Sequence, residues 1–364
     1  NAEALAVEHG ITFRPLFNLP QPTITALEQR AMARSRTKQP DFRGFQIAEV
    51  ANATNDQLLT LARQFNAMPE VEFAYLESLE NEPPGDIAPI TPNYVEQQTY
   101  RHAEIGIDVE STWIVGAKGQ GVRISDCEYG WNTRHEDLDG IAVTPEKRQT
   151  PSPTVHSRGW DEHGTAVLGE ISALDNAYGV TGLAHDAHIQ TFSEWTIEGG
   201  SRRAESIAAA IAASREGDIV LLEMQTNGPG GGYGPAEIDP AVWSIVKNGV
   251  EGGVIVVAAG GNGEQNLDAP EYDSYRRRGD SGAILVGAGS ADTSHQRLWF
   301  STYGSRIDLQ GWGERVVSTG YGTYETIGND VNQRYSIFSG TSSASPIVAA
   351  AAALVQSYAI TQLH

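Results

Sequence analysis

Phe338-Ser339-Gly340-Thr341-Ser342-Ser343-Ala344-Ser345-Pro346 runs directly into the small, apolar stretch 347–353. This pattern predicts a loop that delivers one serine to the first turn of a buried helix. Gly340 permits a tight turn, and Pro346 is tolerated in a first turn, where its N–H would be unpaired anyway. Unpaired N–H groups and the helix dipole there stabilise a developing negative charge. Ser342 is therefore a candidate nucleophile, although the segment alone equally suits a cap on a core helix.

A nucleophilic serine needs a general base, and the base needs a group that orients it. His163 lies within 161–169, just before a small apolar run that predicts another helix start. Asp126 ends a short apolar strand predicted at 121–126, the place where α/β sheets present functional groups. We interpret His163 as the candidate base and Asp126 as the acid that orients it, although either residue alone is more often structural.

Asn262 follows another buried strand pattern, 254–259, and lies in the glycine loop 260–263. Its side-chain NH₂ group is able to donate a hydrogen bond to an oxyanion. An Asn-Gly pair alone usually marks a turn. The chain order of acid, histidine, asparagine and serine is much harder to obtain by accident, and it makes Asn262 a candidate oxyanion donor.

These motifs resemble those of the subtilases, the subtilisin-like serine peptidases, over residues 97–364. The family's histidine motif, His-Gly-Thr-x-Val-x-Gly, stands at 163–169, and its serine motif, Gly-Thr-Ser-x-Ala-x-Pro, stands at 340–346. The order of the catalytic residues also matches. The aspartate motif departs from the family, because Cys127 and Glu128 stand where Ser or Thr and then Gly are usual.

The resemblance implies a serine endopeptidase that acts on proteins or peptides. Ser342 would attack the peptide carbonyl, His163 would take its proton, and Asp126 would orient the imidazole. Asn262 and the Ser342 N–H would bind the oxyanion. Glu128 would add a negative charge near the imidazole and raise the pKa of His163. A catalytically silent binding module and a peptide ligase are the alternatives; the short interval between acid and histidine leaves little room for a ligase's insertion.

The predicted fold is α/β, a mostly parallel sheet with helices on both faces. Apolar strand patterns at 121–125, 219–222, 254–258 and 284–288 alternate with helical stretches near 204–213 and 241–246. The family normally continues through further helices beyond the point at which this chain ends, so we expect a truncated or unusual C-terminal end.

The composition of the chain limits the kinds of binding partner that we expect. The 364 residues carry a net charge of −21, which argues against nucleic acid or an anionic membrane as a partner. The single cysteine, Cys127, excludes an internal disulfide and is expected to be buried within reach of the site. The resemblance implies a secreted enzyme; no leader segment is visible, and we expect that Asn1 follows a processing or trimming point.

Residues 1–80 predict a small α+β, ferredoxin-like unit. Strand patterns lie at 11–13, 42–50 and 71–76, and a capping box at 54–57 starts an amphipathic helix. Ahead of a subtilase, this unit resembles the family's propeptide, which chaperones folding and inhibits the enzyme from within the same chain. An unrelated accessory domain is the alternative. Proline and glycine predict a linker at 81–96, before the catalytic domain at 97–364.

The resemblance also implies a specificity pocket. Its two walls would be formed by Met224, Gln225 and Thr226, and by Ala259, Gly260 and Gly261. The two glycines of the second wall are expected to leave room for a large or apolar substrate side chain. The first wall departs from the family's Ser-Leu-Gly. Acidic residues near the site favour a basic side chain as the alternative.

Calcium is the expected cofactor, with a structural role. The loop 174–180 resembles a family loop that wraps Ca²⁺ with backbone carbonyls and one asparagine side chain. The expected ligands are Asp137, Leu174, Asn176, Tyr178 and Val180. Ligation by oxygen alone suits Ca²⁺. A loop ordered without metal is the alternative, and no Cys/His spacing in the sequence suits zinc.

Overall fold

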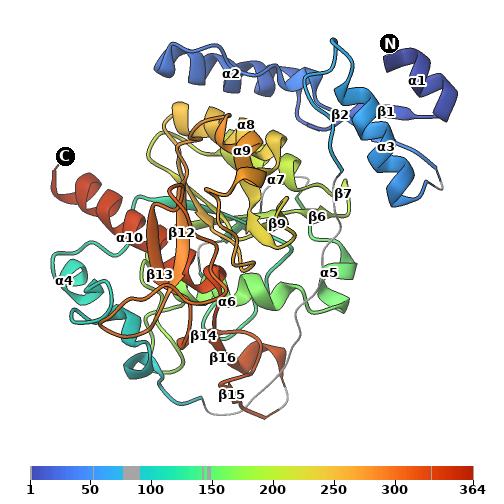
Figure 1. The fold of residues 1–364 in the computed structure, drawn as a ribbon. Coiled ribbons are helices and arrows are strands. Elements are labelled where there is room, and N and C mark those ends of the chain that lie inside the picture. Colours follow the sequence, from blue (N-terminus) through green and yellow to red (C-terminus); the bar gives the residue numbers. More distant parts are fainter. Residues whose placement is uncertain are drawn as a thin grey trace.

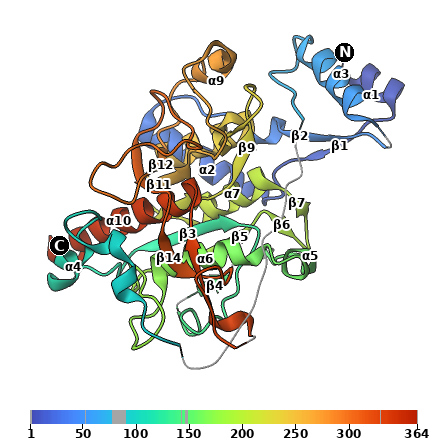
Figure 2. The same ribbon diagram turned by 60° about the horizontal axis from the view of Figure 1, so that its bottom comes forward.

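The computed structural model describes residues 2–51, 53–76, 91–141, 143–145, 149–328 and 330–363. Its centre is a seven-stranded parallel sheet with the strand order β13-β12-β11-β8-β3-β5-β4 (Figures 1 and 2). The strands are β3 (Arg123–Glu128), β4 (Val143–Pro145), β5 (His188–Ser193), β8 (Ile219–Leu222), β11 (Ile255–Ala259), β12 (Ile284–Gly289) and β13 (Leu309–Trp312). The predicted parallel sheet is therefore confirmed, and β3 lies near its middle.

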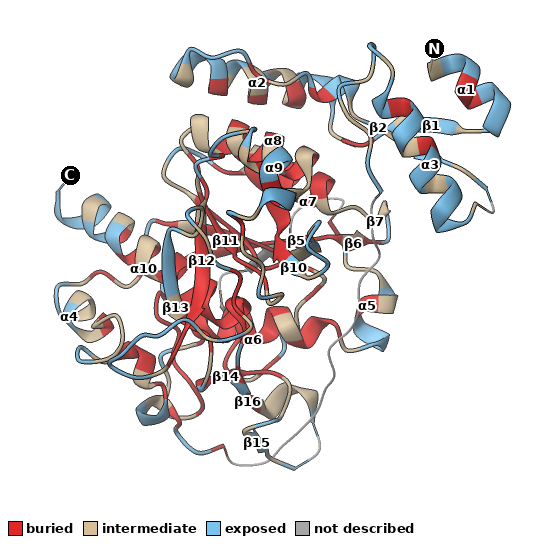
Figure 3. Cartoon of the chain, in the orientation of Figure 1, coloured by how far each residue is buried: buried red, intermediate tan, exposed pale blue. Residues whose placement is uncertain are grey.

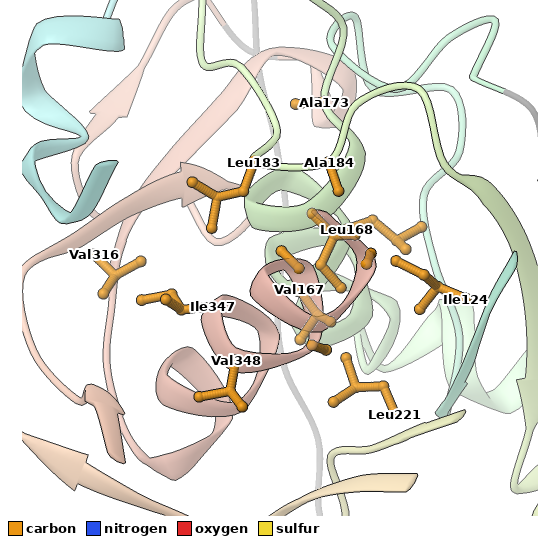
Figure 4. Close-up of a cluster of buried hydrophobic side chains, with 14 of the residues drawn as sticks. Ile124, Val167, Leu168, Ala173, Leu183, Ala184, Leu221, Val316, Ile347 and Val348 are labelled. Carbon is orange, nitrogen blue, oxygen red and sulfur yellow. The ribbon is translucent and has the colours of Figure 1, made fainter. Parts of the chain in front are cut away.

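Helices cover both faces of this sheet. On one face lie α6 (Asp161–Ser172) and α10 (Thr341–Gln362), and on the other lie α7 (Arg203–Ala213) and α8 (Pro240–Glu251). Figure 4 shows Val167 of α6 and Ile347 of α10 in the same cluster of buried side chains. Such burial on both faces explains why the strands read as nearly continuous apolar runs.

The long helix α10 is a core element. By length and composition it is apolar enough to cross a membrane, but 56% of its most apolar window is buried inside the protein. Figure 3 shows the buried half next to the sheet and the exposed half toward the C-terminus. Its first turn therefore starts inside the core, where Ser342 lies.

The remaining elements are short and lie around this core. An antiparallel sheet of β14 (Val316–Thr319), β15 (Glu325–Thr326) and β16 (Arg334–Phe338) leads the chain into α10. Two hairpins are β6 (Trp195–Thr196) with β7 (Gly200–Ser201) and β9 (Gln225–Asn227) with β10 (Tyr233–Pro235). Short α-helices are α4 (Val109–Ile114), α5 (Pro153–Ser157) and α9 (Asp273–Arg276). Single 3₁₀ turns lie at Phe42–Gly44, Val95–Gln97, Thr99–Arg101, Ala236–Ile238, Pro270–Tyr272 and Val331–Gln333.

The N-terminal unit is α+β, but it is simpler than predicted. It consists of α1 (Ala2–His9), β1 (Thr12–Pro15), α2 (Gln21–Ser35), β2 (Gln46–Glu49) and α3 (Asn55–Asn66). Strands β1 and β2 pair antiparallel, and the predicted capping box at the start of α3 is present. The strand predicted at 71–76 does not form, so the ferredoxin-like pattern is incomplete. The reason is local, because the Asn66 side chain hydrogen-bonds both the N–H and the C=O of Ala74.

Helix α2 joins this unit to the rest of the protein by packing against α8 (Figures 1 and 2). Ile24 and Leu27 are buried in the same hydrophobic cluster as α7 and α8. The Arg30 guanidinium donates to the carbonyls of Ile211 and Ser214 at the C-terminal end of α7, at 3.1 and 2.8 Å. A cation suits that end of a helix dipole. Of the predicted linker, residues 81–90 lie outside the described residues.

Candidate active site

Ser342 lies in the first turn of α10, as the sequence predicts. Gly340 precedes this turn with φ of +107°, a conformation that L side chains rarely adopt, and its N–H donates to the Gly313 carbonyl at 2.9 Å. A Cβ on Gly340 would lie 3.1 Å from Nδ2 of Asn262, so glycine also allows these two segments to approach closely. The serine is 6% exposed, and it lies at the helix start, where the helix dipole favours negative charge.

His163 lies in the first turn of α6, and its partner is Glu128. The imidazole Nδ1 hydrogen-bonds to Oε1 of Glu128, at the end of β3. The other carboxylate oxygen of Glu128 accepts from the Tyr129 N–H at 3.3 Å. Because an ionised carboxylate only accepts, the proton sits on Nδ1, and Nε2 is left with a lone pair able to take a proton.

The predicted contact between Asp126 and His163 is wrong. Asp126 is fully buried two residues earlier on β3, and its Oδ2 accepts from the Trp131 indole N–H at 2.6 Å. Its Oδ1 has no hydrogen-bond partner. Burial, and then the charge of Glu128, raise the pKa of Asp126 well above its usual range, whereas the Trp131 hydrogen bond lowers it. Burial thus favours the neutral form of Asp126, which lies behind the site.

The physical reason is the length of β3, which continues through Glu128 because it pairs with β5 as far as Ser193. Residues two apart on a strand share a face, so both acids point toward α6, and only the later one reaches the histidine. A sequence signal for this was present in Glu128-Tyr129-Gly130, which restores the family's glycine two residues after the acid. A Cβ on Gly164, beside His163, would overlap the Gly130 carbonyl oxygen, so backbone meets backbone there.

The electrostatics of His163 follow from this pairing. Burial lowers the pKa of the imidazole, but the charge of Glu128 and its hydrogen bond more than offset this, and the net pKa is raised. The expected effect of Glu128 on this pKa is therefore confirmed in direction. The ring of Phe338 meets the imidazole edge-on, with 5.3 Å between centroids, and covers one side of it.

Asn262 is oriented by the segment that carries the serine. Its Oδ1 accepts from the N–H and the hydroxyl of Thr341, at 2.7 and 3.0 Å. With the carbonyl oxygen engaged in this way, the NH₂ group is the part of the amide that remains for a ligand. The Asn262 N–H donates to the Gln225 side chain at 2.8 Å, which fixes the loop after β11. Asn262 and Ser342 are therefore brought to one place.

Comparison with known proteins shows which family has this sequence pattern. The model of the subtilase family matches residues 119–363. The chain belongs to the subtilase family. This subtilase is 28% identical over 254 residues to the "Major intracellular serine protease" of Bacillus subtilis, which covers 69% of the chain and 73% of that relative. It is 29% identical to Subtilisin NAT of Bacillus subtilis subsp. natto, over 66% of the chain and 57% of the relative.

A solved structure shares the fold. It is a protease from Pseudoalteromonas arctica, and it matches with a TM-score of 0.55 and 22% identity, covering 73% of this chain and 87% of that one. At 22% identity, this similarity is evidence for the fold of the subtilase only. It agrees with a parallel sheet that has helices on both faces.

The two pocket walls predicted from the resemblance are only partly accessible. Met224 is buried in the cluster beneath α7 and α8, so its side chain does not face a substrate. The expectation that Gly260 and Gly261 leave room for a substrate side chain is wrong. A Cβ on Gly260 would lie 2.9 Å from the Val286 carbonyl oxygen, and one on Gly261 would lie 2.6 Å from Cα of Gly234. Protein backbone fills the space that these glycines were expected to leave for a substrate.

The expected calcium ligands come together, but they bond to one another. Oδ1 of Asp137 accepts from the Asn176 NH₂ group at 3.0 Å, and Oδ2 accepts from the Val180 N–H at 2.7 Å and the Tyr335 hydroxyl at 2.9 Å. Oδ1 of Asn176 accepts from the Tyr178 N–H, so the amide cannot turn its oxygen inward without losing this bond. Within the described ranges, no group of three His, Cys, Asp or Glu side chains is placed to hold a metal. This arrangement does not fit Ca²⁺.

We therefore expect EDTA to leave the thermal midpoint of this subtilase unchanged. A calcium site filled at 100 times its Kd stabilises by about 2.7 kcal/mol, so stripping it would lower the midpoint by roughly 5–10 °C. Asp137→Asn should lower the midpoint equally with and without Ca²⁺, because one protein donor loses its acceptor. A midpoint that falls in EDTA and recovers with Ca²⁺ would contradict this interpretation.

Cys127 is buried, as predicted, but it does not lie beside the histidine. It points to the opposite face of the sheet from Glu128, into the cluster beneath α7 and α8. Burial raises the pKa of its thiol, as does the charge of Asp126, while a hydrogen bond from Ser206 lowers it. The expectation that Cys127 lies within reach of the site is not supported for the His163 side of the sheet, because the thiol lies on the opposite face from Glu128.

Proposed function

We propose that this subtilase is a serine endopeptidase with Ser342 as nucleophile, His163 as general base and Glu128 as the orienting acid. The observation that carries the proposal is the hydrogen bond from Nδ1 of His163 to Glu128, which leaves Nε2 free to act as a base. The family membership supports serine peptidase chemistry. The geometry supports Glu128, in place of Asp126, as the acid that orients His163.

In the proposed reaction, the Ser342 hydroxyl attacks the carbonyl carbon of a peptide bond and gives its proton to Nε2 of His163. The carbonyl oxygen becomes an oxyanion, which the Asn262 NH₂ group and the Ser342 N–H stabilise. His163 then protonates the leaving amine, and a water molecule repeats the sequence on the acyl-enzyme. Glu128 keeps the proton on Nδ1 throughout and stabilises the imidazolium.

A fluorophosphonate probe and casein together test this proposal on the full chain. The expected result is hydrolysis of casein and covalent labelling at Ser342, with neither in a Ser342→Ala variant. Labelling without hydrolysis would favour a ligase, and neither labelling nor hydrolysis in correctly folded protein would favour the silent binding module. Both of these outcomes contradict an endopeptidase.

For the N-terminal unit we propose the role of an inhibitor held in the same chain. Besides packing on α8, it reaches the surface near the site, where the Tyr75 hydroxyl hydrogen-bonds to Asp239. Tyr75 and Leu76 line a cavity of about 240 Å³ together with Tyr129 and Thr226, which neighbour the candidate site. The chain beyond this point, from residue 77, lies outside the described residues. Secretion stays a prediction; one relative is named as an intracellular protease.

Self-processing of this unit gives a further prediction. N-terminal sequencing of purified wild-type protein should find a new amino terminus after residue 76, and Ser342→Ala should keep the original one. Arg30→Ala removes the two hydrogen bonds to the end of α7 and should speed dissociation of the cut unit without moving the cut. The same new terminus in Ser342→Ala would show that another protease makes the cut.

A further inference from the structure

The loop that carries Asn262 contains few side chains that could hold it in place. Three of the four residues 260–263 are glycines, and Gly261 has φ of +94°, a conformation that L side chains rarely adopt. These glycines allow the loop to pack closely on the backbone of residues 233–234. Glycine also leaves the backbone more freedom than any other residue does. The position of Asn262 therefore depends on partners outside the loop.

Two segments from outside the loop hold the two ends of Asn262. Thr341, the first residue of α10, donates its N–H and its hydroxyl to Oδ1 of Asn262, at 2.7 and 3.0 Å. Gln225, the first residue of β9, accepts the Asn262 N–H on its Oε1 at 2.8 Å. Because a backbone N–H only donates, this contact fixes which end of the Gln225 amide faces the loop. Thr341 therefore fixes the side chain of Asn262, and Gln225 fixes its main chain.

Gln225 is itself held in place by a buried ion pair. Arg203, the first residue of α7, donates Nη1 to the Gln225 carbonyl oxygen at 2.8 Å and Nε to Oε2 of Glu194 at 2.7 Å. The side chains of Arg203 and Glu194 are only 12% and 4% exposed, so water competes little for these contacts. With one edge of the planar guanidinium bound to Glu194, the direction of Nη1 is fixed. The main chain of Gln225 is therefore anchored to α7.

We propose that Gln225 is a positioning residue for Asn262, an inference that rests on the proposed peptidase function. By holding the Asn262 N–H, the Gln225 side chain keeps the Asn262 NH₂ group at the place where the oxyanion forms. A donor that is already in position costs no reorganisation at the moment of reaction. The Gln225 side chain thereby stabilises the transition state through Asn262, rather than forming part of the pocket wall that the sequence predicts.

A double-variant cycle on the full chain, measured by kcat and KM with a chromogenic peptide, tests this role. Gln225→Met keeps the length of the side chain but has no oxygen to accept the Asn262 N–H. We expect it to lower kcat by about 10-fold with KM nearly unchanged, a part of the loss that removal of an oxyanion donor causes. Asn262→Ala removes that donor but keeps the backbone N–H, and should lower kcat by about 100-fold or more. Adding Gln225→Met to Asn262→Ala should then change kcat by less than about twofold, because the two residues act through one group.

An equal loss of kcat from Gln225→Met with and without the Asn262 side chain would overturn the inference, as would a raised KM with unchanged kcat. If Gln225→Met fails to fold, Gln225→Asn replaces it in the cycle, because its side chain is one carbon shorter and does not reach the Asn262 N–H. Fluorophosphonate labelling separates this failure from failure of the proposed function. An active, labelled wild type whose kcat Gln225→Met leaves unchanged rejects only the role of Gln225, whereas an unlabelled, inactive wild type rejects the peptidase itself.

Discussion

Ser342→Ala should abolish the hydrolysis of casein, lowering kcat by a factor of about 10⁶. The serine supplies the attacking oxygen, and the remaining groups cannot use water in its place with comparable efficiency. His163→Ala should cost about as much, since the nucleophile and its base act as a unit. That magnitude was measured in subtilisin, a member of the same family. Steady-state kinetics on a chromogenic peptide, with single-turnover checks at high enzyme concentration, would measure both losses.

The double variant Ser342→Ala/His163→Ala is the matched control. Because the two residues act as a unit, its activity should equal that of either single variant. Additive losses would mean that the serine and the histidine serve separate steps. Activity of Ser342→Ala near the wild-type level would reject the assignment of the nucleophile altogether.

The second large effect distinguishes the two acids of β3. Glu128→Gln should lower kcat by about 10⁴, because an amide beside Nδ1 supports the wrong tautomer and no longer stabilises the imidazolium. Its residual activity should extend to lower pH than that of wild type, since loss of the charge lowers the raised pKa of His163. The pH dependence of kcat/KM measures both changes.

Asp126→Asn is the paired control, since Asp126 lies on the same face of the same strand. Asparagine resembles the neutral form of the acid that burial favours there, and its carbonyl oxygen is able to accept from the Trp131 indole N–H. We expect kcat within about fivefold of wild type, as for a near-isosteric change that keeps its hydrogen bond. A loss of about 10⁴ in Asp126→Asn, with Glu128→Gln active, would restore the family's usual arrangement.

The elements that depend on local sequence were the most predictable. The serine and histidine each lie at a helix start, and Gly340 and the small residues after Ser342 indicate that start without help from the rest of the fold. The strands β8, β11 and β12 were found because burial on both faces leaves a continuous apolar run in the sequence. The strand expected at 71–76 does not form, because the Asn66 side chain, and not a neighbouring strand, makes the hydrogen bonds to the N–H and C=O of Ala74.

The errors within the site have a common physical origin. The end of β3 is decided by its pairing with β5, and the sequence of β3 alone does not encode this pairing. The sequence of the strand therefore does not show whether Asp126 or Glu128 is the partner of the histidine. Gly260 and Gly261 illustrate the same limit, since a glycine either leaves space for a ligand or is required where backbones pack. Only the positions of Val286 and Gly234 distinguish these cases.

Three buried acids behind the site, Asp126, Glu170 and Glu223, couple folding to the binding of protons. In the unfolded chain each would ionise near its ordinary pKa, whereas burial raises the pKa of each in the folded protein. Folding at a pH between these limits therefore takes up protons from the solvent. Stability that is fully present below the unfolded pKa declines as the pH rises toward the folded one, by about 1.4 kcal/mol per pH unit for each proton taken up. The contribution of these three acids thus weakens the folded state as the pH rises, and protons act on them as stabilising ligands.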